Sequence, residues 1–280
     1  MNIKVRYAKC SNMGDMLNEA IIKEIFGYDV ICSQTRIAEL SAIGSGLGVF
    51  ISNRNLKSFT KMLLYRPFSP KVYVWGTGFI NYSKDKDFII RNVEIVALRG
   101  QLSKERAERA LKKELSCVLS DGGILASYLL NETIEKKYSV GIIPHFREQD
   151  NPIFKKLAAS YNDSLLIDVC KDPHDVIKQI SQCECIISSS LHGLIIADSL
   201  RIPNMHIVCS KKLKGDGFKF DDYYSSYGIN HPYFDLKDNK IPCLIDIVKN
   251  YQIRDQDVEE KKKGMIDSFP FPHNFKYCSL

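Results

Sequence analysis

The sequence predicts an α/β protein that consists of two Rossmann-like domains. Three observations lead to this prediction. The chain has 280 residues, which at roughly 150 residues per domain is enough for about two domains. Short apolar segments alternate with longer amphipathic segments in both halves of the chain, as in parallel βα units. A polar segment, residues 131–137, separates the two halves, and we place the linker between the domains there.

The N-terminal half begins with a strand and a helix. We expect a strand over residues 3–7, and residues 16–26 have apolar side chains at helical spacing. A turn with one glycine, residues 11–15, joins the two. The same order recurs at three later places, namely 72–74 before Gly76-Thr77-Gly78, 93–98 before a helix over 102–115, and 117–119 before Asp121-Gly122-Gly123.

The C-terminal half repeats this pattern more regularly. We expect strands at 140–143, 165–169, 185–187 and 204–208, and helices at 152–161, 172–182 and 192–200. Four strand-and-helix steps of this length build a doubly wound sheet. Beyond them, residues 241–251 are expected to form a helix and residues 255–263 a solvated helix face. The expected domains are therefore 1–134 and 135–250, and residues 251–280 are expected to pack back on the first domain.

The composition is that of an ordinary globular protein. Hydrophobic residues make up 45% of the chain and charged residues 26%, and no apolar run approaches the roughly 20 residues that a membrane-spanning helix needs. The nine cysteines are an odd number and scattered, which favours reduced thiols in the cytoplasm. Their spacing matches no zinc site, so we expect no metal. The net charge of +6 suits anionic substrates, and in the absence of a nucleic-acid-binding motif no such partner is expected.

Ligands of open α/β sheets bind at the carboxyl ends of the strands, so the turns after strands are the first places to search. The strongest candidate is Ser188-Ser189-Ser190-Leu191-His192-Gly193, where a strand ends and a helix begins. Free amides at the helix start and serine hydroxyls together make an anion site, and His192 is placed to exchange protons with the ligand. In the alternative interpretation, Ser189 or Ser190 only caps the helix and His192 packs against neighbouring leucines.

Three further segments are candidates. His145 and Arg147 follow the first strand of the second half, where arginine suits a carboxylate or phosphate, although a solvated loop has the same composition. Residues 12–15 lead into the first helix, and Asp15 has a simple alternative role as a helix cap. Residues 215–224 combine glycines, Lys219, acids and tyrosines, as expected of a loop that closes on a polar ligand or of a plain surface loop.

Taken together, these segments resemble the polysaccharide pyruvyltransferase family, in particular its succinoglycan-type ketal pyruvyltransferase branch. Seven segments occur in one collinear order, namely Asn12 to Asn18, Ala42 to Ser45, Trp75 to Phe79, Ala97 to Gly100, Gly141 to His145, Ser188 to Gly193 and Phe218 to Tyr223. The resemblance implies two Rossmann-like lobes that face each other across a cleft, as in class B glycosyltransferases. It also implies phosphoenolpyruvate as donor, a sugar as acceptor and no cofactor. Two departures are Ser190, where an arginine is expected, and Asp121-Gly122-Gly123, where a turn with proline is common.

The resemblance and the chemistry together assign expected roles. His192 is the expected general acid and base, Arg147 stabilises the departing phosphate, and His145 orients a substrate. The other residues expected at the donor are Ser189, Ser190, Leu191, Gly193, Arg99 and Lys219. Those expected at the acceptor are Asn12, Gly14, Asp15, Asn18, Asp222 and Tyr223.

The resemblance further implies a lipid-diphosphate-linked acceptor and contact with the inner face of the cytoplasmic membrane. The basic residues Arg54, Lys57, Lys61 and Arg66 alternate with apolar ones and are the expected docking surface, unless they belong to an amphipathic helix packed on the first domain. Two other functions stay open from the sequence. One is a glycosyltransferase of similar architecture that uses a nucleotide sugar, and the other is an inactive member that only binds sugar.

Overall fold

The computed structural model describes residues 1–8, 12–52, 60, 67–83, 87–209, 217–236 and 240–278. The basic residues that we expect to dock on a membrane, Arg54, Lys57, Lys61 and Arg66, lie outside these ranges, as do residues 210–216 of the glycine-containing loop. Within the described ranges, none of the helices has both the length and the apolar character needed to cross a bilayer.

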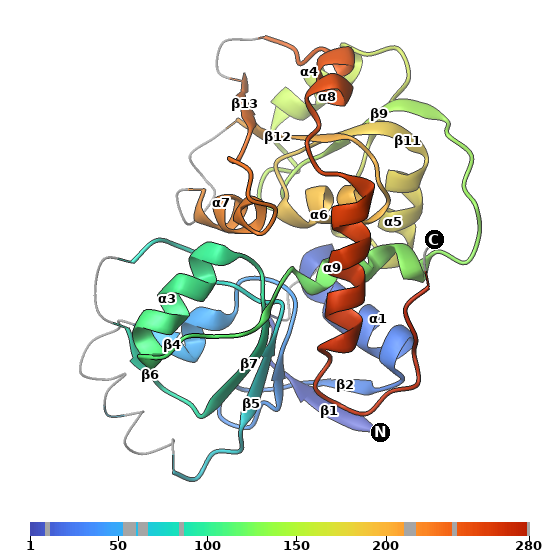
Figure 1. Cartoon of the computed structure of the whole chain (residues 1–280). Coiled ribbons are helices and arrows are strands. Elements are labelled where there is room, and N and C mark those ends of the chain that lie inside the picture. Colours follow the sequence, from blue (N-terminus) through green and yellow to red (C-terminus); the bar gives the residue numbers. More distant parts are fainter. Residues whose placement is uncertain are drawn as a thin grey trace.

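Two parallel sheets organise the described chain, one in each half of the sequence (Figure 1). The first has the order β2-β1-β3-β5-β7-β8, with bounds Asn2–Val5 (β1), Asp29–Cys32 (β2), Leu40–Ser41 (β3), Val72–Trp75 (β5), Val93–Leu98 (β7) and Val118–Leu119 (β8). The second has the order β10-β9-β11-β12-β13, with bounds Tyr138–Ile143 (β9), Ser164–Leu166 (β10), Cys183–Ser188 (β11), Asn204–Val208 (β12) and Tyr233–Asp235 (β13). The predicted α/β class with parallel sheets is confirmed.

Helices connect these strands. Their bounds are Met13–Phe26 (α1), Gln101–Leu111 (α3), Pro152–Ala159 (α4), Pro173–Ser181 (α5), Leu191–Ser199 (α6), Phe218–Ser225 (α7), Leu244–Asn250 (α8) and Asp255–Asp267 (α9). Two 3₁₀ helices, Leu47–Val49 (η1) and Gly122–Leu129 (η2), and an antiparallel pair, Ile51–Ser52 (β4) with Phe88–Ile89 (β6), complete the described elements. The predicted helix over 102–115 ends earlier, at Leu111, because Lys112 adopts a left-handed conformation with φ of 53°.

Several elements differ from the sequence prediction. The first helix begins at Met13 rather than at residue 16, because the Asn12 side chain caps it by accepting the Asp15 amide. The short strands β2, β3 and β13 were not predicted. Residues 218–225 form α7 instead of a loop, and Phe220 and Tyr224 on this helix are buried. The prediction of a substrate-closing loop is therefore wrong for this segment.

The two halves share one hydrophobic core. The same cluster of buried side chains contains Leu17 and Ile21 of α1, Leu125 of η2 and Leu194 and Ile195 of α6. The η2 helix contacts α1, α5, α6 and α9, so the chain crosses from the first half to the second through the middle of this core. A continuous core holds the carboxyl ends of the two sheets against each other.

The C-terminal segment contacts the first half of the chain. In Figure 1, α9 (red) runs from the level of the second sheet down to the first. The Trp75 indole donates a hydrogen bond of 2.9 Å to the Met265 carbonyl, and the Phe269 ring stacks on Phe26 with centroids 3.8 Å apart. The charged stretch that we expected to be only a solvated face has a buried side as well, which includes Val258 and Lys262. Amphipathic packing against η2 and β8 explains this.

Candidate active site

The carboxyl ends of the two sheets meet at His192. A methyl group placed on Gly14, in the first turn of α1, would lie 2.8 Å from both Cγ and Cε1 of the His192 ring. On another side, His192 Nε2 lies 3.9 Å from Oδ1 of Asp121, which follows β8. Ser188 on β11 pairs with Ile143 on β9, so these two strands of the second sheet end at the same level. The predicted residues after β1, β9 and β11 are therefore brought together.

The turn from β11 into α6 is the candidate anion site. Ser190 occupies the N-cap position but forms no side-chain cap, so the first amides of α6 are not satisfied by it. The Ser188 hydroxyl instead holds the turn, because it accepts a 2.9 Å hydrogen bond from the Ser190 amide. A side chain at Gly193 would come within 2.6 Å of that hydroxyl, which explains the glycine. The alternative in which Ser189 or Ser190 only caps the helix is not what the structure has.

Ser189 joins this turn to the one after β9. Its hydroxyl donates to Glu148 Oε2 at 2.7 Å and accepts a hydrogen bond from the His145 amide at 2.9 Å. Nδ1 of His145 accepts the Arg147 amide at 3.3 Å, so the proton of a neutral His145 ring belongs on Nε2. Burial, together with the charges of Lys219 and Arg147, lowers the pKa of His145 to about 3. The ring is therefore a neutral donor, and the Arg147 side chain beside it is exposed.

His192 and Asp121 form the electrostatic centre of the site. Burial, followed by the charges of Lys219, Arg99 and His145, lowers the pKa of His192 to about 3. Burial also raises the pKa of Asp121 to about 6, against the opposing hydrogen bond from the Gly123 amide. Both His192 Nε2 and Asp121 Oδ2 are buried without a hydrogen-bond partner. Unsatisfied buried polar atoms are rare in native proteins, so this pair is a candidate place for a ligand or a proton.

Lys219 lies within electrostatic reach of the same centre. It follows Gly217, whose φ of 85° favours glycine, in the first turn of α7. Its positive charge lowers the pKa of both His145 and His192, and burial lowers its own pKa to about 8. Lys219 is thus the cation that α7 contributes to this site.

The residues predicted on the acceptor side fall into two groups. Asp15 stays next to Gly14, and burial raises its pKa to about 6. Asn18 is fully buried and ties α1 to the turn after β3, because it accepts the Ile43 amide at 3.0 Å and donates to the Ile43 carbonyl at 3.3 Å. Asn12, the cap of α1, also donates to the Asp15 carboxylate.

Arg99, Asp222 and Tyr223 lie inside the protein with their polar atoms bonded to it. Arg99 and Asp222 form an ion pair whose side chains are both 0% exposed. Asp222 also accepts hydrogen bonds from the amide and the hydroxyl of Ser103, at 2.7 and 2.6 Å. The Tyr223 hydroxyl donates to Asp198 at 2.6 Å. These contacts fasten α7 to the end of β7 and to α6, and Arg99 reaches the site only through the field of its charge.

Sequence reasoning missed Asp121 and Glu148 as site residues. Asp121 stood out only as part of a turn with two glycines, although an acid directly after a strand was the available signal. Glu148 is 2% exposed, and nothing in its local sequence distinguishes it from the exposed acid Asp150 nearby. Its role as a partner of Ser189 becomes visible only in three dimensions.

Comparison with known proteins places this site in a family. Residues 12–211 match the model of the family described as polysaccharide pyruvyl transferase. The chain belongs to this family. A relative is the "Uncharacterized protein L143" of Acanthamoeba polyphaga mimivirus, 28% identical over 229 residues that cover 80% of this chain and 73% of that protein. The "Succinoglycan biosynthesis protein ExoV" of Rhizobium meliloti (strain 1021) is 26% identical over 226 residues, which cover 79% of this chain and 63% of that protein.

The predicted resemblance is confirmed, and the polysaccharide pyruvyl transferase match includes most of the residues described above. It extends from Asn12, the cap of α1, across His145, Arg147 and His192. Lys219 and Asp222 lie beyond its end. In this polysaccharide pyruvyl transferase, Ser190 stands where an arginine was expected, and Lys219 and Arg99 provide positive charge that acts on His192.

Proposed function

We propose that this protein transfers the pyruvate unit of phosphoenolpyruvate to two hydroxyl groups of a sugar and releases phosphate. Two bonds form between the sugar oxygens and C2 of the donor, and the bond between C2 and the phosphate oxygen breaks. One hydroxyl proton ends on the methylene carbon and the other on phosphate, so the reaction balances without a cofactor or metal. Family membership supports this reaction, and the unpartnered pair of His192 Nε2 and Asp121 Oδ2 is the observation that carries it.

The donor would bind at the second sheet. Arg147 is suited to the carboxylate or phosphate, and the first amides of α6, which include those of Leu191 and Gly193, provide hydrogen-bond donors for an anion. The Ser189 and Ser190 amides are used within the protein, where they donate to the Ile143 carbonyl and the Ser188 hydroxyl. His145 donates from Nε2, and Lys219 contributes a charge. An anionic donor in this place raises the pKa of His192, because it offsets the cations that now lower it.

His192 would move protons between the substrates. When the donor is bound, the Asp121 carboxylate at 3.9 Å favours the protonated imidazole. The protonated ring delivers its proton to the methylene carbon and recovers one from a sugar hydroxyl. Asp121 acts through His192, so we assign it as a positioning residue and not as a catalytic one.

The acceptor would lie against Gly14, Asp15 and Asn12, on the side of the first sheet. We no longer assign Asn18, Asp222, Tyr223 and Arg99 to substrate contacts, since their polar atoms hold the protein together. The succinoglycan relative supports an exopolysaccharide or capsular polysaccharide precursor as acceptor. A lipid-diphosphate-linked form, bound at the cytoplasmic face of the membrane, is part of the same proposal.

The two sheets would belong to two Rossmann-like lobes that face each other across the site, as in class B glycosyltransferases. Their separation along the chain, with residues 2–119 and 138–235 each forming one parallel sheet, supports this. Residues 131–137 would be the linker, and residues 251–280 a strap that returns to the first lobe.

The test is turnover with phosphoenolpyruvate and a panel of sugar acceptors, followed by phosphate release and by mass spectrometry of the pyruvylated glycan. We expect His192→Ala to lower turnover by about 10²- to 10⁴-fold, the usual contribution of a general acid and base. His174→Ala is the matched control, since His174 is 43% exposed and pairs with Glu24 on the protein surface. Unchanged turnover in His192→Ala would contradict the assignment. A product that carries sugar from a nucleotide sugar would instead favour a glycosyltransferase.

A further inference from the structure

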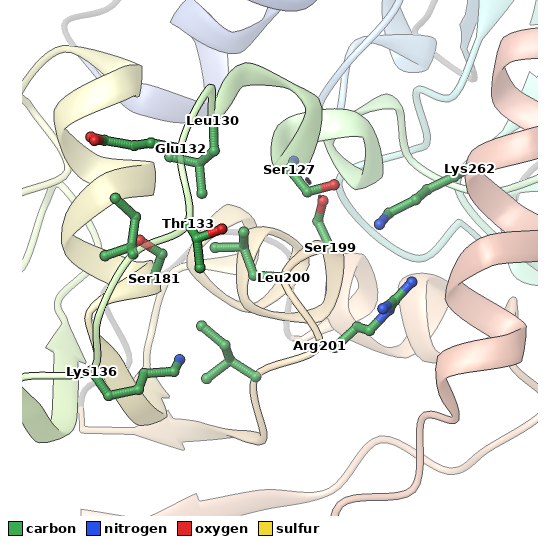
Figure 2. Close-up of a pocket in the computed structure, with 12 residues that line it drawn as sticks. Ser127, Leu130, Glu132, Thr133, Lys136, Ser181, Ser199, Leu200, Arg201 and Lys262 are labelled. Atoms are coloured by element: carbon green, nitrogen blue, oxygen red, sulfur yellow. Dashed lines mark hydrogen bonds between the residues drawn. The ribbon is translucent and has the colours of Figure 1, made fainter. Parts of the chain in front are cut away.

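A second polar cavity lies at the opposite end of α6 from His192. Its volume is about 310 Å³, and residues of η2, the linker, the end of α6 and α9 line it (Figure 2). None of its lining residues belongs to the site described above. Because α6 begins at the proposed donor site and ends at this cavity, one short helix joins the two places.

Three cations enter the cavity from three different segments. Figure 2 shows Lys136 of the linker on one side, and Arg201 after α6 and Lys262 of α9 on the other. Arg201 and Lys262 both donate to Oε1 of Glu259, at 2.7 and 3.0 Å. Lys136 donates to the Cys183 carbonyl at 2.6 Å. The Glu259 carboxylate therefore pairs with two of the three positive charges.

The acid that lines the cavity does not balance these charges. Glu132 is directed to the outside, where it accepts a hydrogen bond of 2.7 Å from Lys178. Burial lowers the pKa of Lys262 and of Lys136, against the opposing effects of Glu259 on Lys262 and of Glu184 on Lys136.

Two buried polar atoms of the cavity lining have no hydrogen-bond partner. The Ser127 hydroxyl is buried without a partner, and Ser127 as a whole is only 5% exposed. Nε of Arg201 is also buried and unpartnered. Each lysine ammonium carries three N–H groups, of which the bonds named above use one. A ligand that satisfies such a set must be rich in acceptors and negatively charged.

We propose that this cavity is a second anion site, which binds the phosphate group of a small phosphorylated molecule or phosphate itself. Figure 2 shows Ser127, Lys262 and Arg201 on the same side of the cavity, and a phosphate has enough oxygens to accept from these three. The apolar side chains of Leu130 and Leu200 would border the remainder of a larger ligand, with Lys136 at its far side. The occupant would join η2, the end of α6 and α9.

Hydrogen-exchange mass spectrometry with inorganic phosphate tests this proposal, because it separates the cavity from the donor site. At a phosphate concentration of about ten times Kd, we expect amide hydrogen exchange to slow about tenfold in peptides covering residues 127–136 and 199–203. This holds for exchange that requires an opening in which the ligand is released. Lys262→Met should abolish this protection and leave any protection of residues 189–193 unchanged. Lys263→Met is the matched control, since Lys263 is an exposed neighbour that does not line the cavity.

Two results would overturn the proposal. One is no protection of residues 127–136 and 199–203 in the wild type at millimolar phosphate. The other is the same protection in Lys262→Met as in the wild type. Ser127→Ala provides a second variant in which only an unpartnered hydroxyl is removed, and it should weaken the protection at unchanged thermal stability. Glucose 6-phosphate, compared with phosphate and with glucose, distinguishes a larger ligand from the free ion.

Discussion

Arginine and acid residues stand at the carboxyl ends of both sheets, yet they are used differently. At the end of β7, Arg99 donates to Asp222, Gly44, Ser45 and Phe79, and no part of its side chain is exposed. At the end of β9, Arg147 is exposed. The first arginine is an internal tie and the second is available to a ligand.

The acids differ in the same way. Asp222 accepts from Arg99 and twice from Ser103, whereas Asp121 keeps one oxygen without a partner beside His192. We expect a full set of hydrogen-bond partners at a buried charge that serves the fold, and an unpartnered oxygen at one that acts in the proposed chemistry. Residue type alone does not distinguish these two expected roles. The number of polar atoms that have a hydrogen-bond partner does.

The largest effect is expected at the internal tie. Asp222→Ala leaves Arg99 buried without its counter-charge, and such a loss lowers the free energy of unfolding by about 3–5 kcal/mol. Chemical denaturation measures it. Asp267→Ala, at an exposed acid on α9, should change stability by less than about 0.5 kcal/mol. If Asp222→Ala lowers the free energy of unfolding by less than about 1 kcal/mol, the distinction between structural and functional charged residues is lost.

Asp121→Asn should make the protein more stable at neutral pH and less active. Burial raises the pKa of Asp121 from 3.8 to about 6, so the folded state binds its proton more tightly than the unfolded state does. The contribution of Asp121 to the free energy of unfolding of the wild type is fully present below about pH 4. It is lost as the pH rises through 6. The variant should therefore gain up to about 3 kcal/mol above pH 6 and nothing near pH 4, at about 1.4 kcal/mol per pKa unit.

Denaturation curves of Asp121→Asn and the wild type from pH 4 to 8 check this. The pH profile of turnover distinguishes a role of Asp121 in positioning His192 from a role in folding. Asp121→Asn removes the charge that favours protonated His192, so the activity should decline at a lower pH than in the wild type. If the variant is destabilised equally at every pH, Asp121 is a structural residue.

Gly14→Ala tests the contact between the two sheets. The added methyl group would lie 2.8 Å from Cγ of His192, so the ring must move. Overpacking of this kind lowers stability by about 1–3 kcal/mol, and a displacement near 1 Å can lower turnover about 10²-fold. Gly48→Ala is the control, because no atom lies within 4 Å of a methyl group there. Wild-type turnover in Gly14→Ala would show that His192 works in another position.

The smallest effect on stability is expected for Arg147→Ala. Replacing an exposed side chain outside the packed core usually changes the free energy of unfolding by no more than about 0.5 kcal/mol. Equilibrium denaturation in urea should therefore give the wild-type midpoint. A clear loss of stability would mean that Arg147, like Arg99, is part of the fold.

Local sequence signals predicted most of the second sheet. The apolar segments that become β9, β11 and β12 are separated by amphipathic helices of ordinary length, and each local preference agrees with the fold. The strand β2 escaped prediction because it lies at the edge of its sheet and none of its residues is fully buried, and β3 because it consists of one apolar residue and a serine. Helix α7 escaped because its glycine, lysine, acids and tyrosines have the composition of a loop, and distant contacts such as Arg99 with Asp222 hold it.

The sequence predicted where the candidate site lies, but not which of its residues contact one another. The rule that ligands bind at strand ends brought forward His145, Arg147 and His192. It could not distinguish Arg99, whose partner Asp222 lies 123 positions further along the chain. Nor could it reveal Asp121 as the neighbour of His192, because that proximity depends on how the two sheets are packed together.

The most direct test of the central claim is the shift in thermal midpoint on titration with phosphoenolpyruvate. A ligand that binds only the folded state contributes about 2.7 kcal/mol at 100 times its Kd. We expect phosphoenolpyruvate to stabilise the wild type and an Arg109→Ala control, an exposed arginine on α3, and to lose most of this effect in Arg147→Ala. An equal shift in Arg147→Ala, or stabilisation by a nucleotide sugar and not by phosphoenolpyruvate, would contradict the account.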